Sequence, residues 1–171
     1  FVHSINGKKV TPHFIKLNYP FRISRFNRRL RKRSIELQVW CSGRIIKYTP
    51  NFLEDNYGCA VGRGNSAWGF IIRSAKAIDN NLISMPLFAL YGYDTNFPKN
   101  QDNPLLIQIP NYYGQDPLDW VESNIIRPIL KLWTETIINT GLILELHGQN
   151  TVILINDDGK TEIIGRDADV Y

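Results

Sequence analysis

The sequence predicts an α+β fold in which a long helix packs on an antiparallel sheet and the chain ends in a β-hairpin. Apolar residues recur at helical spacing between residues 117 and 140, which predicts the helix. Apolar strands on both sides of Asp157-Asp158-Gly159-Lys160 predict the hairpin. Alternating or continuous apolar runs at 9–19, 68–73 and 81–92 predict further strands.

Signals at both ends of the long apolar pattern support the helix. Asp116 is an N-cap residue, and Pro117 fits the first helical position. Pro128 lies inside the pattern and predicts a bend, because proline lacks a backbone N–H. Gly141 follows the last apolar position and predicts the helix end.

Other segments carry weaker signals. Ser24 predicts the cap of a short helix inside an arginine-rich run, and Ser34 predicts the cap of a second helix that ends near Gly43. Residues 51–66 are rich in Gly and Asn and predict a loop or a weak strand. Residues 93–116 carry several prolines and predict a long surface excursion.

The composition predicts one domain, or part of one, over residues 1–171. The 171 residues can bury a core, and 43% of them are apolar, which excludes a disordered chain. No apolar run is long enough to predict a membrane span, and the first residues carry no secretory signal pattern. The two cysteines predict neither a disulfide framework nor a zinc site, so we expect a cytoplasmic protein. The missing initiator Met suggests a piece of a longer chain.

The positive charge is local. Residues 1–33 hold ten of the twenty Lys and Arg residues and no acid. The remaining chain holds ten basic residues against sixteen acids, a net charge of −6. A local basic patch attracts an anion, which can be phosphate, a carboxylate or a nucleic acid.

Polar residues gather between the predicted helix and the hairpin, in the stretch Leu-Glu-Leu-His-Gly-Gln-Asn at 144–150. The hairpin should bring Asn150 near Asp167, and oxygen ligands of this kind suit Mg²⁺. His147 and Gln149 can reach phosphate or ribose oxygens. Protein kinases arrange an Asn and a metal-binding Asp around a comparable strand pair. The alternative is a turn whose polar side chains only satisfy local backbone groups.

Residues 144–167, LELHGQNTVILINDDGKTEIIGRD, resemble the Glu-x-His-Gly-Gln-Asn … Arg-Asp segment of the aerobactin synthetase (IucA/IucC) family, whose members make siderophores without a non-ribosomal peptide synthetase. The similarity extends over about residues 116–168. Residues 16–30, KLNYPFRISRFNRRL, resemble the family motif Lys-x-Ser-Leu … Ile-Thr-Ser-x-x-Arg-Thr-Leu more loosely. Arg25 and Arg29 depart from this motif, and Ala168 follows Arg-Asp where the family usually has Phe.

The resemblance implies a central ATP-binding portion, with the palm-like fold, of a longer ligase. Family members activate citrate or a similar carboxylate with ATP as an acyl-adenylate, and an amine or hydroxyl then attacks it. Arg28 and His147 would be catalytic, and Glu145 and Asp167 would hold Mg²⁺. The residues implied in ATP binding are Ser24, Arg28, His147, Gln149, Asn150 and Asp167. Arg73, at the end of a predicted strand, is a further candidate for binding a substrate anion.

Two other classes of function stay open from the sequence alone. The first is a fragment of a kinase-like phosphotransferase, for which Gly62-Arg63-Gly64 is a weak phosphate loop. The second is a non-catalytic module that binds anions or nucleic acid through the arginine-rich run, although no nucleic-acid motif accompanies that run. A homodimer is one of the assemblies that the sequence allows.

Overall fold

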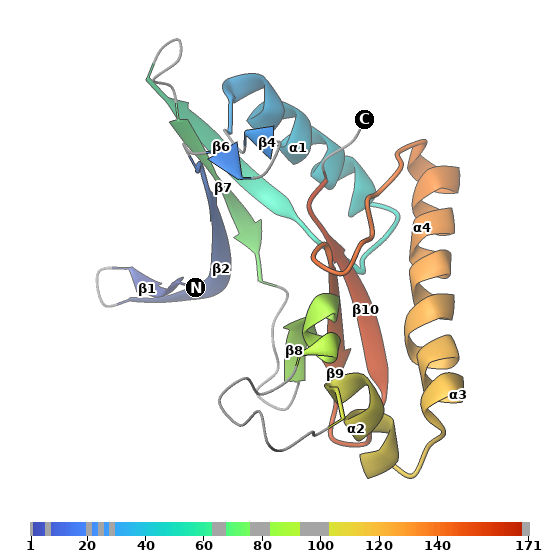
Figure 1. The fold of residues 1–171 in the computed structure, drawn as a ribbon. Helices are drawn as coiled ribbons and strands as arrows, with labels where there is room; N and C mark the ends of the chain where they lie inside the picture. The colour runs from blue at the N-terminus through green and yellow to red at the C-terminus, as the bar shows by residue number, and fades with distance from the viewer. Residues whose placement is uncertain are drawn as a thin grey trace.

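The computed structural model describes residues 2–5, 8–19, 22–23, 26–27, 30–62, 68–75, 83–92 and 103–168. The fold is α+β, as predicted, with two four-stranded sheets and one two-stranded sheet. Figure 1 shows the first sheet with α1 beside it, and the second sheet with the long helical segment along it. In the described part of the chain, none of the helices combines the length and the apolar composition that a membrane-spanning helix needs.

The first sheet has the antiparallel order β1-β2-β7-β6. Its strands are β1 (Val2–Ile5), β2 (Lys8–Leu17), β7 (Trp68–Ser74) and β6 (Asp55–Val61). The predicted strands at 9–19 and 68–73 are therefore confirmed as β2 and β7. Helix α1 (Lys32–Ile45) packs on one face of this sheet, where Ile35 and Ile71 form a small core with Leu30.

Two glycines allow α1 to approach the first sheet closely. A Cβ built on Gly58 of β6 would lie 2.1 Å from Ile35 Cγ2, and one on Gly69 of β7 would lie 2.3 Å from Ile35 Cδ1. Because these two glycines have no side chain, the side chain of Ile35 can occupy the space next to them. Since Ile35 is buried, this contact fixes the position of α1 on the sheet.

The second sheet has the order β5-β10-β9-β8. Its strands are β5 (Phe52–Leu53), β10 (Thr161–Arg166), β9 (Thr151–Ile155) and β8 (Ile83–Pro86). Strand β5 pairs with β10 in parallel, and the other two pairs are antiparallel. Strands β9 and β10 form the predicted hairpin, and Gly159 supplies the left-handed residue of its turn with φ of 80°.

The predicted long helix is confirmed as a continuous helical segment over residues 117–140. It comprises α3 (Pro117–Val121), the π-helical turn η3 (Glu122–Ile126) and α4 (Arg127–Thr140). The side chain of Asp116 accepts hydrogen bonds from the N–H groups of Leu118 and Asp119, and Gly141 ends the helix with φ of 72°. Its buried face packs on the second sheet in the largest core cluster, which includes Trp120, Ile125, Leu132, Ile153 and Ile163.

A π-helical turn, which ends at Ile126, lies just before Pro128, the position where the sequence predicts a bend. Pro128 has no N–H to donate to the carbonyl of Asn124, four residues earlier. The side chain of Thr161 on β10 contacts Asn124 instead, at 3.4 Å to the carbonyl and 2.8 Å to Oδ1. The irregular turn therefore also ties the helix to the hairpin.

Helix α1 does not begin at the predicted cap, Ser34. It begins at Lys32, and its N-cap residue is Arg31, which makes no side-chain cap bond. Leu30 before the cap packs with Ile35 in the first turn, an arrangement known as a hydrophobic staple. Apolar burial, and not cap chemistry, therefore sets the start of this helix, which runs to Ile45, two residues beyond Gly43.

Three other predictions about elements need correction. The prediction of a short helix in the arginine-rich run is wrong, because β3 (Arg22–Ile23) and β4 (Phe26–Asn27) pair as antiparallel strands there. Ser24, the predicted cap of that helix, lies outside the described residues. The predicted strand at 81–92 is correct only for β8, because Leu87–Tyr91 form the 3-10 helix η2 after Pro86. Within 93–116, Leu105–Tyr112 form helix α2, whose apolar residues join the core under the long helix.

The close approach of α1 gives a stability prediction. Gly69→Ala should lower the free energy of unfolding by about 1–3 kcal/mol, because its Cβ would lie 2.7 Å from the carbonyl oxygen of Cys59. Gly43→Ala is the matched control, since nothing lies within 4 Å of that Cβ in α1. It should raise the free energy of unfolding by about 1 kcal/mol through helix propensity alone. Urea unfolding of both variants measures the two effects, and equal values would contradict the packing argument.

Candidate functional site

The polar stretch between α4 and β9 forms a compact turn over residues 147–150. The N–H of Asn150 donates to the carbonyl of His147 at 2.9 Å, and the N–H of Gln149 donates to His147 Nδ1 at 3.3 Å. Phe88 donates its N–H to the carbonyl of Gly148 at 3.0 Å, which ties the turn to η2. Glu145, His147 and Gln149 are exposed, and Asn150 is buried. The turn therefore has a fixed backbone and exposed polar side chains.

Arg166 joins this turn to the end of the hairpin. Its backbone N–H donates to the carbonyl of Asn150 at 2.9 Å. Its guanidinium donates twice to the carbonyl of Gln149, from Nε at 2.9 Å and from Nη2 at 2.6 Å. Burial lowers the pKa of Arg166, and the positive charge of Arg73 lowers it further. The hairpin thus pairs the backbone of Asn150 with that of Arg166, the residue before Asp167.

Asp167 turns its carboxylate toward the first sheet. It is the only non-glycine residue with positive φ, at 73°, among those described. Its Oδ1 accepts hydrogen bonds from Lys16 Nζ of β2 and, at 3.3 Å, from Arg73 Nη2 of β7. Burial alone would raise the pKa of Asp167, but the charges of Lys16 and Arg73 outweigh burial and lower it. The side chain is 19% exposed.

Arg73 also pairs with Asp55, its direct neighbour across β6 and β7. Arg73 Nε donates to Asp55 Oδ1 at 2.7 Å, and Nη2 donates to Oδ2 at 3.3 Å. The side chain of Arg73 is 8% exposed and that of Asp55 is 0% exposed. Burial raises the pKa of Asp55, and the negative charge of Asp167 adds to this rise, so that the lowering effect of Arg73 is outweighed. For Arg73, both carboxylates outweigh burial and raise the pKa.

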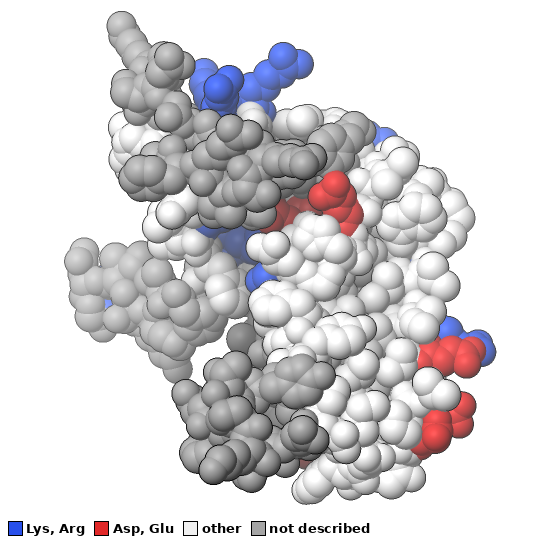
Figure 2. Space-filling view, in the orientation of Figure 1, with Lys and Arg blue, Asp and Glu red and all other residues white. Residues whose placement is uncertain are grey.

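Helix α1 contributes two polar contacts to this charged group. Gln38 Oε1 accepts a hydrogen bond from Lys16 Nζ at 3.2 Å. Ser42 Oγ accepts one from the backbone N–H of Asp55 at 2.7 Å. Both side chains are buried and lie one helical turn apart on the face that packs against the first sheet. Figure 2 shows basic and acidic side chains next to one another near the centre of the face drawn there.

The structure describes six of the predicted site residues. Backbone hydrogen bonds connect the turn to Arg166, the neighbour of Asp167, and a side-chain hydrogen bond joins Asp167 to Arg73; the six are Glu145, His147, Gln149, Asn150, Asp167 and Arg73. Ser24 and Arg28 lie outside the described residues. Sequence reasoning missed Lys16 and Asp55 as members of the site, although Lys16 begins the stretch that resembles the first family motif.

The described residues fit a magnesium ion that arrives with phosphate better than a preformed metal cage. No group of three or more His, Cys, Asp or Glu side chains in the described part of the chain can hold a metal. Mg²⁺ is commonly held by one or two carboxylates together with substrate phosphates. Asp167 Oδ2 has no hydrogen-bond partner among the described residues, and Glu145 is exposed. The positive charges of Lys16 and Arg73 beside Asp167 would repel Mg²⁺. The negative charge of the phosphates would offset this repulsion when the metal ion arrives with them.

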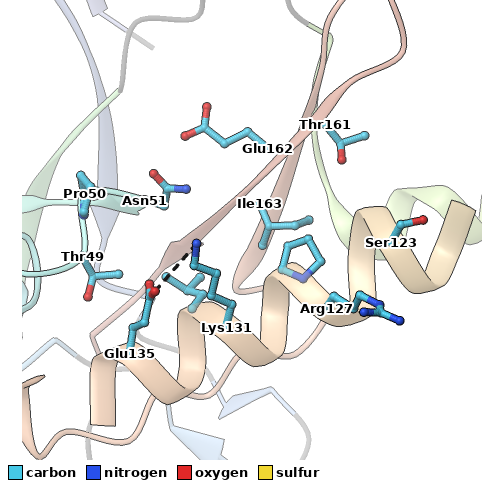
Figure 3. A pocket seen from close by; sticks show the side chains of 12 residues that line it. Thr49, Pro50, Asn51, Ser123, Arg127, Lys131, Glu135, Thr161, Glu162 and Ile163 are labelled. Atoms are coloured by element: carbon cyan, nitrogen blue, oxygen red, sulfur yellow. Dashed lines mark ion pairs between the residues drawn. The ribbon is translucent and has the colours of Figure 1, made fainter. Parts of the chain in front are cut away.

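A separate pocket of about 470 Å³ lies between α4, β10 and residues 49–51 (Figure 3). Lys131 and Glu135 of α4 border it and approach each other at 3.9 Å. None of the predicted site residues lines this pocket. Its lining carries both positive and negative side chains, so it does not favour an anion. We therefore place the candidate site around Asp167, Lys16 and Arg73.

Two solved structures resemble the fold. The petrobactin biosynthesis protein AsbB from Bacillus anthracis str. Sterne matches 92% of this chain with a TM-score of 0.71 at 16% identity. Aerobactin synthetase IucC from a hypervirulent pathotype of Klebsiella pneumoniae matches 77% of it with a TM-score of 0.55 at 19% identity. This chain spans 28% of the first protein and 24% of the second. No protein-family model and no curated protein sequence matches it. The resemblance to siderophore synthetases is therefore confirmed at the level of the fold.

The buried position of Arg73 gives a second stability prediction. Arg73→Gln should lower the free energy of unfolding by about 3–5 kcal/mol, because it leaves the buried carboxylate of Asp55 without a charged partner. Arg127→Gln is the matched control, since it breaks an exposed ion pair with Glu122, and should change stability by about 1 kcal/mol or less. Urea unfolding at pH 7 measures both. Equal losses in the two variants would show that the buried pair is not critical.

The lowered pKa of Asp167 predicts how stability depends on pH. A carboxyl group with a lower pKa in the folded chain stabilises the fold above its unfolded pKa of about 3.9, and this contribution is lost as the pH falls through the folded pKa. Asp167→Asn should therefore be less stable than the wild type at pH 7. The difference should shrink as the pH falls below about 4. Urea unfolding between pH 7 and pH 3 tests this, and a constant difference would contradict it.

Proposed function

We propose that this chain is the ATP-binding part of a ligase that activates citrate or a similar carboxylate as an acyl-adenylate in siderophore biosynthesis. An amine or hydroxyl substrate would then attack the activated carboxylate. The observation that supports this most directly is the backbone pairing of Asn150 with Arg166, which sets the polar turn beside Asp167, Lys16 and Arg73. The likeness of the fold to AsbB and IucC, over 92% and 77% of this chain, supports the proposal further, and the cytoplasm is the compartment we propose.

The charges of the site suit an anionic ligand. Lys16 and Arg73 are held side by side on one carboxylate oxygen of Asp167. Cations fixed in this way can stabilise negative charge on a phosphate or a carboxylate without reorganising during the reaction. His147 and Gln149 are exposed at the neighbouring turn and can donate hydrogen bonds to a bound nucleotide. Arg28 and Ser24, which lie outside the described residues, remain part of the proposed ATP site.

Bound MgATP would supply the electrophilic phosphorus that a carboxylate attacks and the leaving pyrophosphate. In this proposal Glu145 and Asp167 hold the metal, His147, Gln149 and Asn150 bind the nucleotide, and Arg73 binds a substrate anion. Asn150 is 7% exposed, and its carbonyl accepts a hydrogen bond from Arg166. We therefore expect Asn150 to fix the shape of the turn as well as to contact the nucleotide.

The other two classes of function have less support. A kinase-like enzyme needs a loop that covers the phosphates, and its weak candidate, Gly62-Arg63-Gly64, lies outside the described part of the chain from residue 63 onward. A nucleic-acid module would use the arginine-rich run, of which several residues also lie outside it. No specific observation favours either class, and both are distinguishable by their products or ligands.

The proposed function predicts that the chain binds MgATP and that His147→Ala weakens this binding at least about tenfold, which corresponds to about 1.4 kcal/mol. His13→Ala on β2 is the control of the same residue type and should bind MgATP as the wild type does. Isothermal titration calorimetry measures the affinities. A citrate-dependent exchange of pyrophosphate into ATP tests the adenylation step, and release of AMP when an amine or hydroxyl substrate is added tests the attack on the adenylate.

Other outcomes would point elsewhere. Formation of ADP in place of AMP would favour a kinase-like phosphotransferase. Tight, salt-sensitive binding of oligonucleotides without nucleotide turnover would favour the nucleic-acid module. Unchanged MgATP binding after His147→Ala would count against the turn as the nucleotide site.

A further inference from the structure

An irregularity in β6 aims the side chain of Asp55 at Arg73. The register of β6 with β7 shifts between Asp55 and Tyr57, where one extra residue, Asn56, forms a bulge. Beyond the bulge Tyr57 pairs with Ile72, and before it Asp55 pairs with Arg73. In a regular strand Asp55 and Tyr57 would share a face. The bulge moves Asp55 to the opposite face, where α1 covers it, while Tyr57 stays exposed.

The contact between Asp55 and Arg73 uses one particular edge of the guanidinium. Asp55 accepts hydrogen bonds from Nε at 2.7 Å and from Nη2 at 3.3 Å. Asp167 accepts the other bond of Nη2 at 3.3 Å. None of the described residues accepts a hydrogen bond from Nη1, so its two N–H groups remain for a ligand. Only 8% of the Arg73 side chain is exposed. Few orientations of a guanidinium so far from water would give its N–H groups hydrogen-bond partners.

Stability alone is a weak reason for this arrangement. Buried ion pairs often contribute little net stability compared with apolar residues of the same volume. The pair nevertheless receives three separate supports: the bulge at Asn56, the hydrogen bond from the Asp55 N–H to Ser42, and cover from α1. These supports fix the direction of the Asp55 carboxylate, which in turn fixes the plane of the guanidinium.

We infer that Asp55 is a positioning residue, which holds Arg73 by Nε and Nη2 so that its Nη1 edge is presented to an anionic group of the substrate or nucleotide. The inference rests on the proposed function, because it assumes that the group around Asp167 binds an anion. Asp55 itself has a fully buried side chain and does not reach a ligand. Its hydrogen bonds to Arg73 carry the positioning effect.

The experiment uses inorganic pyrophosphate, which tests the cationic group without the nucleotide. Calorimetric titrations compare the wild type with Asp55→Asn, Arg73→Lys and the double variant. Asp55→Asn should weaken pyrophosphate binding about tenfold through the loss of an oriented, charge-assisted hydrogen bond. A Lys at position 73 has no guanidinium plane to orient. The double variant should therefore bind within about twofold of Arg73→Lys alone.

The outcomes separate a positioning role from a purely electrostatic one. If Asp55 only neutralised charge, its replacement by Asn would strengthen pyrophosphate binding, and this result would overturn the inference. Additive losses in the double variant, or a wild type that binds no pyrophosphate, would overturn it as well. A wild type that binds pyrophosphate but not MgATP contradicts the proposed function and leaves the inference standing.

A control and a second measurement cover loss of stability. Ile153→Val removes one methyl group from the core of the second sheet and should leave pyrophosphate affinity unchanged. If Asp55→Asn does not fold, nitrogen-15 spectra of the wild-type arginine side chains provide the test. The Arg73 Nε–H should be protected from exchange, and pyrophosphate should shift the Nη1 signal. An Nη1 signal that pyrophosphate leaves unchanged would overturn the inference.

Discussion

The buried guanidinium of Arg73 connects the two halves of the fold. A charged side chain that is only 8% exposed is stable only with carboxylates beside it, since the interior solvates ions poorly. One carboxylate, Asp55, comes from the neighbouring strand of the first sheet. The other, Asp167, follows the last strand of the second sheet. The end of the hairpin is therefore tied to the first sheet by this shared charge, in addition to the parallel pairing of β10 with β5, the strand that leads into β6.

Several local features follow from this constraint. Asp167 adopts a left-handed backbone conformation, which costs a non-glycine residue of order 1 kcal/mol and places its carboxylate between Lys16 and Arg73. The bulge in β6 turns Asp55 inward, and α1 carries buried Gln38 and Ser42 on a face that would otherwise be apolar. Arg166 has a different task, since its guanidinium holds the carbonyl of the polar turn. His147 and Gln149 remain exposed and are the side chains that a ligand can meet directly.

The sequence predicted the second half of the chain better than the first, for a physical reason. The long helix and the hairpin carry strong local signals in Asp116, Gly141 and Gly159, and the structure confirms both elements. The start of α1 depends on Leu30 packing against Ile35, and the role of Asp55 depends on a bulge, which alternation cannot reveal. Lys16 and Arg73 meet Asp167 across more than ninety residues of sequence, so only the tertiary fold brings them together.

The contacts of Asp167 also bear on how an anion would enter the proposed site. Lys16 and Arg73 would repel each other strongly at this depth if Asp167 did not lie between them. The carboxylate thus occupies the position of an anion while no ligand is bound, and a phosphate that approaches Nη1 of Arg73 competes with it for the same cations. Under the proposed function, Asp167 would help to hold the Mg²⁺ that comes with the phosphates, and this added positive charge would keep the carboxylate paired while the phosphates interact with Lys16 and Arg73.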